Sequence, residues 1–351
     1  MFIDAIHVAR LVTIATTAFV VAFLAMPLWI ALLKKWHVGK SIRDESSAPI
    51  MAKLHAGKAG TPTMGGLVIW GTVVFLIFAY RAACYFQFEP LCNLSFFSRA
   101  QTRLPLGILV GAGLLGLMDD YLNVRKIGPR GGGLRMRVRL LSYTTIALAG
   151  AYWFFSRLQW DFVHIPFVGT YHIGWWYVPF FVFVVVSTSF SVNETDGLDG
   201  LAGGTLMTSF GAMALISFAQ GRLDLAAFCL TILGALLAFL WFNVPPASVF
   251  MGDTGAMSLG TVLAVVAMIT NTTLLLPIIG LPFVIESASV LLQIASKKIR
   301  KKKLFRSSPL HHHLEAVGWP EQQIVLRNWI ISLMSAAIGV VLALVDRTLF
   351  L

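Results

Sequence analysis

The sequence predicts an all-α integral membrane protein with about ten transmembrane helices. Of its 351 residues, 57% are hydrophobic and only 12% are charged, whereas about 25% of an ordinary soluble domain is charged. Apolar runs long enough to cross a bilayer recur along the whole chain. These runs are continuous and do not alternate with polar residues, so helices are favoured over barrel strands. We therefore expect one polytopic membrane domain over residues 1–351.

Ten apolar runs are candidates for the membrane spans. A helix needs about 20 residues to cross a hydrocarbon core of about 30 Å, and shorter runs of about 17 residues also suffice. The candidates cover residues 12–33, 64–80, 104–120, 139–155, 175–192, 201–219, 225–242, 255–271, 273–296 and 328–345.

The basic residues predict the orientation of these spans. Loops 34–62, 121–139 and 297–327 contain six, six and eight of the 27 Lys and Arg residues. With ten spans, all three loops fall on one side of the membrane. The positive-inside rule makes that side cytoplasmic and both termini external. The same rule accounts for the net charge of +11, and we expect no nucleic-acid partner because no basic stretch lies in a fold that reads a groove.

The loops on the opposite side are nearly neutral and rich in aromatic residues. The stretch FVHIPFVGTYHIGW at 162–175 has the glycine and β-branched content of a short hairpin. Cys84 and Cys92 lie in the external loop before it. They would pair if that loop faces an oxidising compartment, but unpaired thiols are the expected state.

Each of the five inside loops contains a polar cluster. The clusters are GKAGTPTMGG (57–66), DDYLN (119–123), NETDGLDGLAGG (193–204), NVPPASVFMGDTG (243–255) and SSPLHHHLE (307–315). The outside loops contain no comparable set. Such a gathering of Gly, Asp, Asn, Pro and His residues on one membrane face predicts an active-site cleft at the cytoplasmic surface.

The adjacent Asp119 and Asp120 follow fifteen uncharged residues, Leu104 to Met118, which span about 22 Å as a helix. The pair therefore lies near the membrane boundary, where an ionised carboxylate is costly unless it is paired, hydrated or bound to a cation. Capping against Arg125 and Lys126 is the weaker interpretation, because negative charge at a helix C-terminus opposes the macrodipole. Three further aspartates share the predicted face: Asp196, Asp199 and Asp253. We predict a Mg²⁺ site that serves phosphate chemistry.

Other motifs agree with phosphate chemistry. TPTMGG and TDGLDGLAGG predict exposed backbone N–H groups at helix starts, which suit a phosphate or a nucleotide. No Walker A or dinucleotide fingerprint appears, which argues against an ordinary P-loop enzyme. His311, His312 and His313 point in different directions on a helix, so we expect phosphate donors and not zinc ligands. Glu286 lies within an apolar run and is either a helix–helix contact or a catalytic group.

Together and in this order, the five clusters resemble the polyprenyl-phosphate N-acetylhexosamine-1-phosphate transferase superfamily over essentially the whole chain. PLHHHLE resembles the phospho-N-acetylmuramoyl-pentapeptide transferase branch more than the GlcNAc-phosphate branches. The resemblance implies ten helices, often in a homodimer, in the bacterial cytoplasmic membrane. It implies transfer of phospho-N-acetylmuramoyl-pentapeptide from its UDP carrier to undecaprenyl phosphate, with Mg²⁺ required. The products would be lipid I and UMP, in the first membrane step of peptidoglycan synthesis.

The resemblance also implies roles for residues that match the family motifs. The implied catalytic residues are Asp119, Asp120, Asp253 and His311, and Asp253 is also the implied Mg²⁺ ligand. The implied uridine pocket consists of Asn193, Asp196, Gly197, Leu198 and Asp199, with Phe250 stacking on the base. The residues implied around the nucleotide and the sugar phosphate are Lys58, Asn243, Gln293, His311 and His312.

Two positions depart from the family pattern. Asn123 stands where the family usually has Lys, so Arg125 or Lys126 would supply that charge. Glu194 stands where the family usually has an apolar or small residue. The motifs leave open a direct or a covalent route, and which aspartate of the pair acts as the base. A sister enzyme that moves GlcNAc-1-phosphate is the nearest alternative. A cation transporter is another, although transporter sites tend to lie near the membrane midplane.

Overall fold

The computed structural model describes residues 5–39, 58, 60–98, 101–128 and 132–350. Long helices lie at all ten predicted positions. They are α1 (Ala5–Lys35), α3 (Gly66–Tyr85), α5 (Arg103–Val124), α6 (Met136–Tyr152), α7 (Tyr177–Thr195), α8 (Leu201–Ala219), α9 (Leu223–Asn243), α10 (Gly252–Ile269), α12 (Leu281–Ile299) and α14 (Glu321–Phe350). The prediction of a helical membrane protein is confirmed at this level, because eight of these helices are long and apolar enough to cross a membrane.

The two remaining helices, α6 and α12, are more polar at the end where the candidate site lies. α6 has only 17 residues and contains Arg137 and Arg139 in its first turn. α12 contains the buried Glu286 and ends with Lys297 and Lys298. Their charges lower the hydropathy of both helices and place polar groups beside the predicted active site.

Short elements complete the connections. They are α4 (Glu89–Cys92), a π-helical turn (Trp153–Arg157), β1 (Phe162–Ile165), β2 (Gly169–His172), a 3-10 turn (Gly174–Trp176), α11 (Leu276–Ile279) and α13 (Leu310–Ala316). β1 and β2 pair antiparallel and confirm the predicted hairpin. The run 273–296 was expected to form one span, but it is divided at Gly280 into α11 and α12. Pro282 lies in the first turn of α12, where its missing N–H costs nothing.

Helix α10 is the centre of the bundle. It packs against α3, α5, α7 and α8, and 94% of its apolar stretch is buried. A helix that is apolar or small on every side is typical of such a central position. By contrast, 28% of the apolar stretch of α1 and 22% of that of α14 is buried. Their exposed apolar faces suit contact with lipid.

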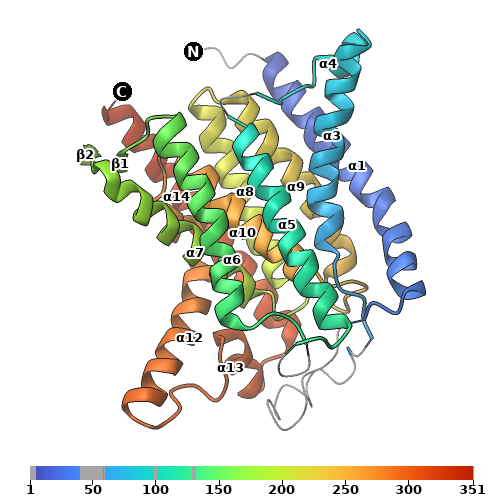
Figure 1. Cartoon of the computed structure of the whole chain (residues 1–351), viewed down its shortest axis with the longest axis vertical. Helices are drawn as coiled ribbons and strands as arrows, with labels where there is room; N and C mark the ends of the chain where they lie inside the picture. The colour runs from blue at the N-terminus through green and yellow to red at the C-terminus, as the bar shows by residue number, and fades with distance from the viewer. Residues whose placement is uncertain (1–4, 40–57, 59, 99–100, 129–131, 351) are drawn as a thin grey trace.

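The two ends of the bundle carry different elements (Figure 1). The start of α1, the end of α14, α4 and the β1–β2 hairpin lie at one end, which we call the hairpin end. The last turns of α1, α5 and α12, together with α13, lie at the other, which we call the site end. Some residues of the basic loops and of the GKAGTPTMGG motif lie outside the described residues. They are Lys40, Arg43, Lys53, Gly57, Ala59 and Arg130.

At the hairpin end, a disulfide joins Cys84 to Cys92. The expectation of unpaired thiols is therefore wrong. After α3 the chain folds back on itself, because the N–H of Phe88 donates to the carbonyl of Ala83 at 2.9 Å. This turn brings the two cysteine Cα atoms to 4.5 Å. In the described part of the chain the remaining cysteine, Cys229, is a buried thiol in α9.

Candidate active site

The adjacent carboxylates at the end of α5 have different partners. Asp120 accepts hydrogen bonds from the backbone N–H groups of Asp253 and Thr254, both at 3.0 Å. These groups belong to the first turn of α10, so Asp120 caps that helix, whose positive end favours a carboxylate. Asp119 instead accepts a hydrogen bond from the N–H of Leu134 at 2.6 Å and contacts Arg139. The two aspartates therefore join different parts of the chain to α5.

Glycine at position 252 makes this cap possible. Gly252 has a φ of +76°, a conformation that other residues rarely adopt. A Cβ atom there would lie 2.5 Å from Oδ2 of Asp120, which is too close for any side chain. The glycine of the VFMGDTG motif thus allows the backbone of α10 to approach the carboxylate of α5.

Arg139, in the first turn of α6, joins the acidic groups. Its Nη2 lies 2.6 Å from Oδ2 of Asp119 and 3.1 Å from Oδ2 of Asp253. Its Nη1 donates to Oδ1 of Asn193 at 3.1 Å, and Asn193 donates to Oδ1 of Asp253 at 2.5 Å. Helices α5, α6, α7 and α10 thus meet at these groups. We call Asp119, Asp120, Arg139, Asn193 and Asp253 the acid cluster.

A second group surrounds Lys58. Its Nζ lies 2.7 Å from Oδ1 of Asp199 and 2.5 Å from Oε1 of Glu321, the first residue of α14. The neighbouring N–H of Gly200 donates to Oδ1 of Asn243 at 2.9 Å. We call Lys58, Asp199 and Glu321 the lysine cluster. It brings together a loop residue, the turn between α7 and α8, and the last helix.

A third group contains the first histidine of the HHH motif. His311 is fully buried, and its Nδ1 lies 3.0 Å from Oε2 of Glu286. Its backbone N–H donates to the same oxygen at 3.2 Å, so Glu286 holds α13 against α12. The ring also packs on Gly197, where a Cβ atom would lie 2.2 Å from Nε2. Among the described residues, Nε2 of His311 has no hydrogen-bond partner.

Residues 193–200 connect these three groups. Asn193 belongs to the acid cluster, Gly197 contacts the histidine ring and Asp199 belongs to the lysine cluster. The segment is short because α7 ends and α8 begins within it. Predicted site residues from all five polar clusters of the sequence therefore lie at the site end, and this one motif joins them.

Other predicted binding residues have contacts within the protein. The side chain of Gln293 accepts hydrogen bonds from the N–H groups of Leu304 and Phe305 and donates to the carbonyl of Phe305. Nδ1 of His312 lies 2.9 Å from Oε2 of Glu315. Gln293 thus holds the loop after α12 in place. The predicted contacts of Gln293 and His312 with the nucleotide stay predictions.

Three further predicted residues lie along the connecting segments. Leu198 is buried in a small apolar cluster with residues of α8 and α14. The N–H of Asp196 donates to the carbonyl of Asn193 at 3.3 Å. Phe250 is fixed through its backbone, because its N–H donates to Pro62 and its carbonyl accepts from Gly65, both at 2.8 Å. The stacking of its ring on a base stays a prediction.

Several N–H groups of the glycine-rich stretches, which the prediction left exposed, are occupied within the protein. The N–H groups of Gly65 and Gly66 donate to the carbonyls of Phe250 and Met251, both at 2.8 Å. The N–H of Gly200 is taken by Asn243, as described above. These groups are occupied because the TPTMGG segment packs directly on the loop before α10. Backbone N–H groups at these positions therefore hold the site together.

The cation at the acid cluster is Arg139, which the sequence analysis counted only as a loop charge. Arg125, expected to supply a charge near Asn123, lies over the ring of Tyr121 at 5.5 Å. In the described part of the chain, neither Arg125 nor Lys126 forms an ion pair with the aspartates of α5. The sequence did contain an indication that Arg139 belongs to the site, because this charged residue is the first residue of the predicted span 139–155. A charge in such a position is functional by default.

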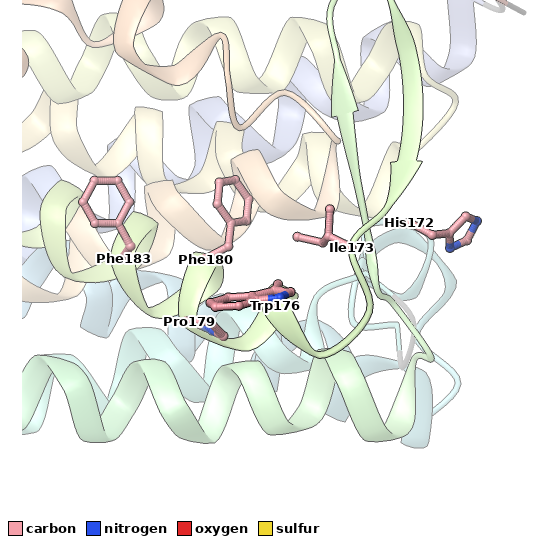
Figure 2. A pocket seen from close by; sticks show the side chains of 6 residues that line it. All are labelled: His172, Ile173, Trp176, Pro179, Phe180 and Phe183. Carbon is pink, nitrogen blue, oxygen red and sulfur yellow. The ribbon is translucent and has the colours of Figure 1, made fainter.

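An apolar groove lies beside the acid cluster. It has a volume of about 680 Å³ and is lined by α6, α7 and Leu291 of α12. Its lining includes Leu140, next to Arg139, and Phe190, which lies one turn before the asparagine of the acid cluster. A second hollow of about 690 Å³ continues along α7 toward the hairpin end and shares Phe183 with the groove. Figure 2 shows Phe180 and Phe183 on one side of α7, with the ring of His172 directed away from them.

Comparison with protein families covers these same segments. A family model described as glycosyl transferase family 4 matches residues 103–271, which include the whole acid cluster. Signature 1 of the phospho-N-acetylmuramoyl-pentapeptide-transferases matches residues 58–69, from Lys58 to the start of α3. The fold and the site thus define a membrane-embedded transferase of the glycosyl transferase 4 class.

Relatives identify the family within that class. A phospho-N-acetylmuramoyl-pentapeptide-transferase of Chloroflexus aggregans is 37% identical over 96% of this chain and 90% of the relative. Enzymes of the same name from Geobacillus thermodenitrificans and Bacillus anthracis are 41% and 40% identical. They match 92% and 94% of this chain, and 94% and 97% of the respective relatives. The chain belongs to the phospho-N-acetylmuramoyl-pentapeptide-transferase family, and the predicted resemblance is confirmed.

Proposed function

We propose that this chain transfers phospho-N-acetylmuramoyl-pentapeptide from its UDP carrier to undecaprenyl phosphate, which forms lipid I and releases UMP. The names of its relatives supply the sugar substrate. The observation that supports the proposal most is the acid cluster, in which Asp119, Asn193 and Asp253 from three helices converge on Arg139. Such a convergence at one end of the bundle suits a reaction between a lipid and a soluble nucleotide.

The reaction exchanges one phosphoanhydride bond for another. An oxygen of the lipid phosphate attacks the β-phosphorus of the UDP-sugar. The bond between the α-phosphate and the β-phosphate breaks, and UMP leaves with the electron pair. Both substrates are anions, so the protein must mainly neutralise charge and align the reacting groups. Arg139 is already in place as a cation beside Asp253, and its contacts with Asp119 and Asn193 fix its orientation.

The oxygen atoms of the acid cluster suit a hard divalent cation, and we include Mg²⁺ in the proposal. Asp253 would be its ligand, and Asp119 would be a second donor. Oδ2 of Asp119 is buried and pairs with the same guanidinium group as Asp253. The described residues contain no preformed group of three or more metal-ligating side chains. Mg²⁺ typically takes one or two carboxylates and completes its shell with substrate phosphates and water, and it would neutralise charge on the diphosphate.

The two aspartates of α5 would have different tasks in this reaction. Asp120 uses both carboxylate oxygens to cap α10, so neither is available as a base without loss of the cap. Oδ2 of Asp119 pairs with the side chain of Arg139 and not with the backbone of a helix, so it can meet a substrate without loss of a cap. We therefore assign to Asp119 the contact with the lipid phosphate and the removal of its proton. Whether Asp119 also forms a covalent intermediate is tested by a search for a phosphorylated aspartate with the UDP-sugar alone.

The apolar groove along α7 supports a path for the polyprenyl chain. Most of its lining residues belong to α6 and α7, which also supply Arg139 and Asn193. A polyprenyl tail in this groove would bring its phosphate to the acid cluster without leaving the bilayer. The lipid partner of the proposed reaction thus has an apolar surface beside the reacting groups.

We also propose that the single domain crosses the membrane ten times, with the site end in the cytoplasm and both termini outside. The last turns of α1 and α12 end in lysine pairs at the site end, which the positive-inside rule favours in the cytoplasm. The Cys84–Cys92 disulfide lies at the opposite end, and disulfides persist in oxidising compartments. A membrane-impermeant maleimide tests this topology. In a chain without native cysteines and in intact cells, Val168→Cys would be labelled and Lys303→Cys would be protected.

A homodimer is the remaining part of the proposal. The exposed apolar faces of α1 and α14 offer surface for a second copy, in competition with lipid. Light scattering of the purified protein, corrected for bound detergent, separates the two states. A protein mass of 38.5 kDa would be the monomer, and twice that mass is expected.

The decisive experiment is a transfer assay with purified protein in nanodiscs. Undecaprenyl phosphate and Mg²⁺ are supplied with either UDP-N-acetylmuramoyl-pentapeptide or UDP-GlcNAc, and both UMP and the lipid-linked sugar are measured. Both products are expected with the muramoyl donor, and chelation of Mg²⁺ stops their formation. Products from UDP-GlcNAc alone would identify the sister enzyme, and transport of a donor without release of UMP would contradict any transferase.

A further inference from the structure

We propose that Glu321 is a positioning residue, which fixes Lys58 and the turn at 196–200 for binding of the nucleotide. The first turns of α14 would thus be part of the nucleotide site. This inference rests on the proposed function, because it concerns the binding of the UDP-sugar and of UMP. Neither Glu321 nor any other residue of α14 belongs to the motifs that predicted the site.

One oxygen of Glu321 contacts both parts of this arrangement. Oε1 lies 2.5 Å from Nζ of Lys58 and accepts a hydrogen bond from the backbone N–H of Asp199 at 2.9 Å. The carboxylate of Asp199 closes the group, because its Oδ1 lies 2.7 Å from the same Nζ. Its Oδ2 accepts a hydrogen bond from the N–H of Ala247 at 3.0 Å. Glu321 therefore fixes the lysine directly and the aspartate through its backbone.

The following two turns of α14 hold the same segment. Nε1 of Trp329 donates to the carbonyl of Gly200 at 3.0 Å. Ile324 and Val325 pack against Leu198 in an apolar cluster that is separate from the main core. Polar and apolar contacts from one helix thus surround the turn, which suits a rigid support more than a single chance ion pair.

The contacts with Asp199 and Glu321 limit the conformational freedom of the Lys58 side chain. An ammonium group has three donors, and two of them are directed at the carboxylates of Asp199 and Glu321. The side chain of Lys58 remains 22% exposed, so a donor can reach a ligand. A lysine that is ordered before the ligand arrives loses less conformational entropy on binding. Removal of Glu321 should therefore weaken nucleotide binding while the acid cluster stays intact.

The test uses Glu321→Gln in the full-length protein, with thermal unfolding as a check of the fold. The Kd for UMP is measured by calorimetry with Mg²⁺, and the KM for the UDP-sugar is measured in the transfer assay. We expect both to rise about tenfold, as for loss of a hydrogen bond to a charged group, and kcat to fall less than about threefold. Glu321→Asp keeps the charge and should give an intermediate Kd. An unchanged Kd, or a lower kcat at unchanged KM, would overturn the inference.

A double-mutant cycle tests whether Glu321 acts through Lys58. In a Lys58→Ala background, Glu321→Gln should raise the Kd for UMP less than about threefold. A rise of the full tenfold in that background would show that Glu321 does not act through Lys58. The matched control is Asp346→Asn, a buried carboxylate at the other end of α14, which should leave the Kd for UMP unchanged. If the wild type neither binds UMP nor releases it, the proposed function itself fails; if it does both and Glu321→Gln matches it, only this inference fails.

Discussion

A buried carboxylate lies beside a basic side chain at each end of the bundle. At the hairpin end, Asp346 of α14 lies 2.6 Å from Nε2 of His164 and accepts a hydrogen bond from the N–H of Phe167 at 2.6 Å. At the site end, Asp119 and Asp253 share the guanidinium group of Arg139. Burial and an ionisable partner are therefore common to both ends, and neither property alone distinguishes a reaction centre.

The difference lies in the number of helices whose charged side chains converge. Asp346 joins the hairpin to one helix, and each of its carboxylate oxygens has a protein partner. The acid cluster instead joins side chains of four helices, and two of its carboxylates share one guanidinium group. This convergence of charged groups from several helices distinguishes the site end from the hairpin end.

The sharpest test of this contrast is Asp253→Asn. Asparagine keeps the size of the side chain and can still contact Asn193 and Arg139, so the fold should persist. Loss of the charge should lower Mg²⁺-dependent release of UMP by about 10²–10³-fold, as for other groups that stabilise charge in a transition state. The rate of UMP release and the thermal unfolding temperature are measured together, with Asp346→Asn as the control. Normal turnover of Asp253→Asn would reject Asp253 as the metal ligand.

Substitution of Arg139 should have the next largest effect. Lysine keeps the charge but lacks the planar fork that contacts Asp119, Asn193 and Asp253 together, so Arg139→Lys should lower kcat about tenfold. Arg139→Gln should lower kcat about 100-fold, because it also leaves the buried Asp119 and the partly buried Asp253 without their cation. Steady-state kinetics over a Mg²⁺ titration provide the measurement. Wild-type kcat in Arg139→Lys would show that a point charge suffices and that the fork geometry is not needed.

The elements of the fold were predictable because spans must be apolar. The ten apolar runs predicted the helix positions. The separation of α11 from α12 at Gly280 depends on packing and was not predicted. The pairing of Cys84 with Cys92 was also missed, because it depends on a backward turn that the spacing of eight residues permits but does not require.

The members of the site were predictable only in part. The motifs marked Asp119 and Asp120 together, but neighbours on a helix point about 100° apart, and only the position of α10 shows which of them is its cap. Arg139 and Glu321 were missed as site residues for a similar reason. Their partners lie far away in the sequence, so their roles come from the tertiary structure.

Asp120→Ala tests the difference between the two neighbours. Its loss leaves two buried N–H groups at the start of α10 without an acceptor, which should lower the free energy of unfolding by about 2 kcal/mol. Asp119→Ala removes the acceptor of one backbone N–H, that of Leu134, and Arg139 keeps its contacts with Asp253 and Asn193. It should therefore cost less stability, although both variants lose activity. Thermal unfolding in nanodiscs compares the two proteins. Equal unfolding temperatures would contradict the assignment of Asp120 to the cap and Asp119 to the reaction.

Asp346→Asn should have the smallest effect and completes the comparison. The amide oxygen can still accept the hydrogen bond from Phe167, and only the contact with His164 changes. The free energy of unfolding should therefore fall by about 1 kcal/mol, with kcat and KM as in the wild type. The hairpin end would then be a structural attachment, because loss of a buried charge there leaves the chemistry intact. A tenfold fall in kcat would instead show that the hairpin end is coupled to the acid cluster through α14, and the contrast between the two ends would fail.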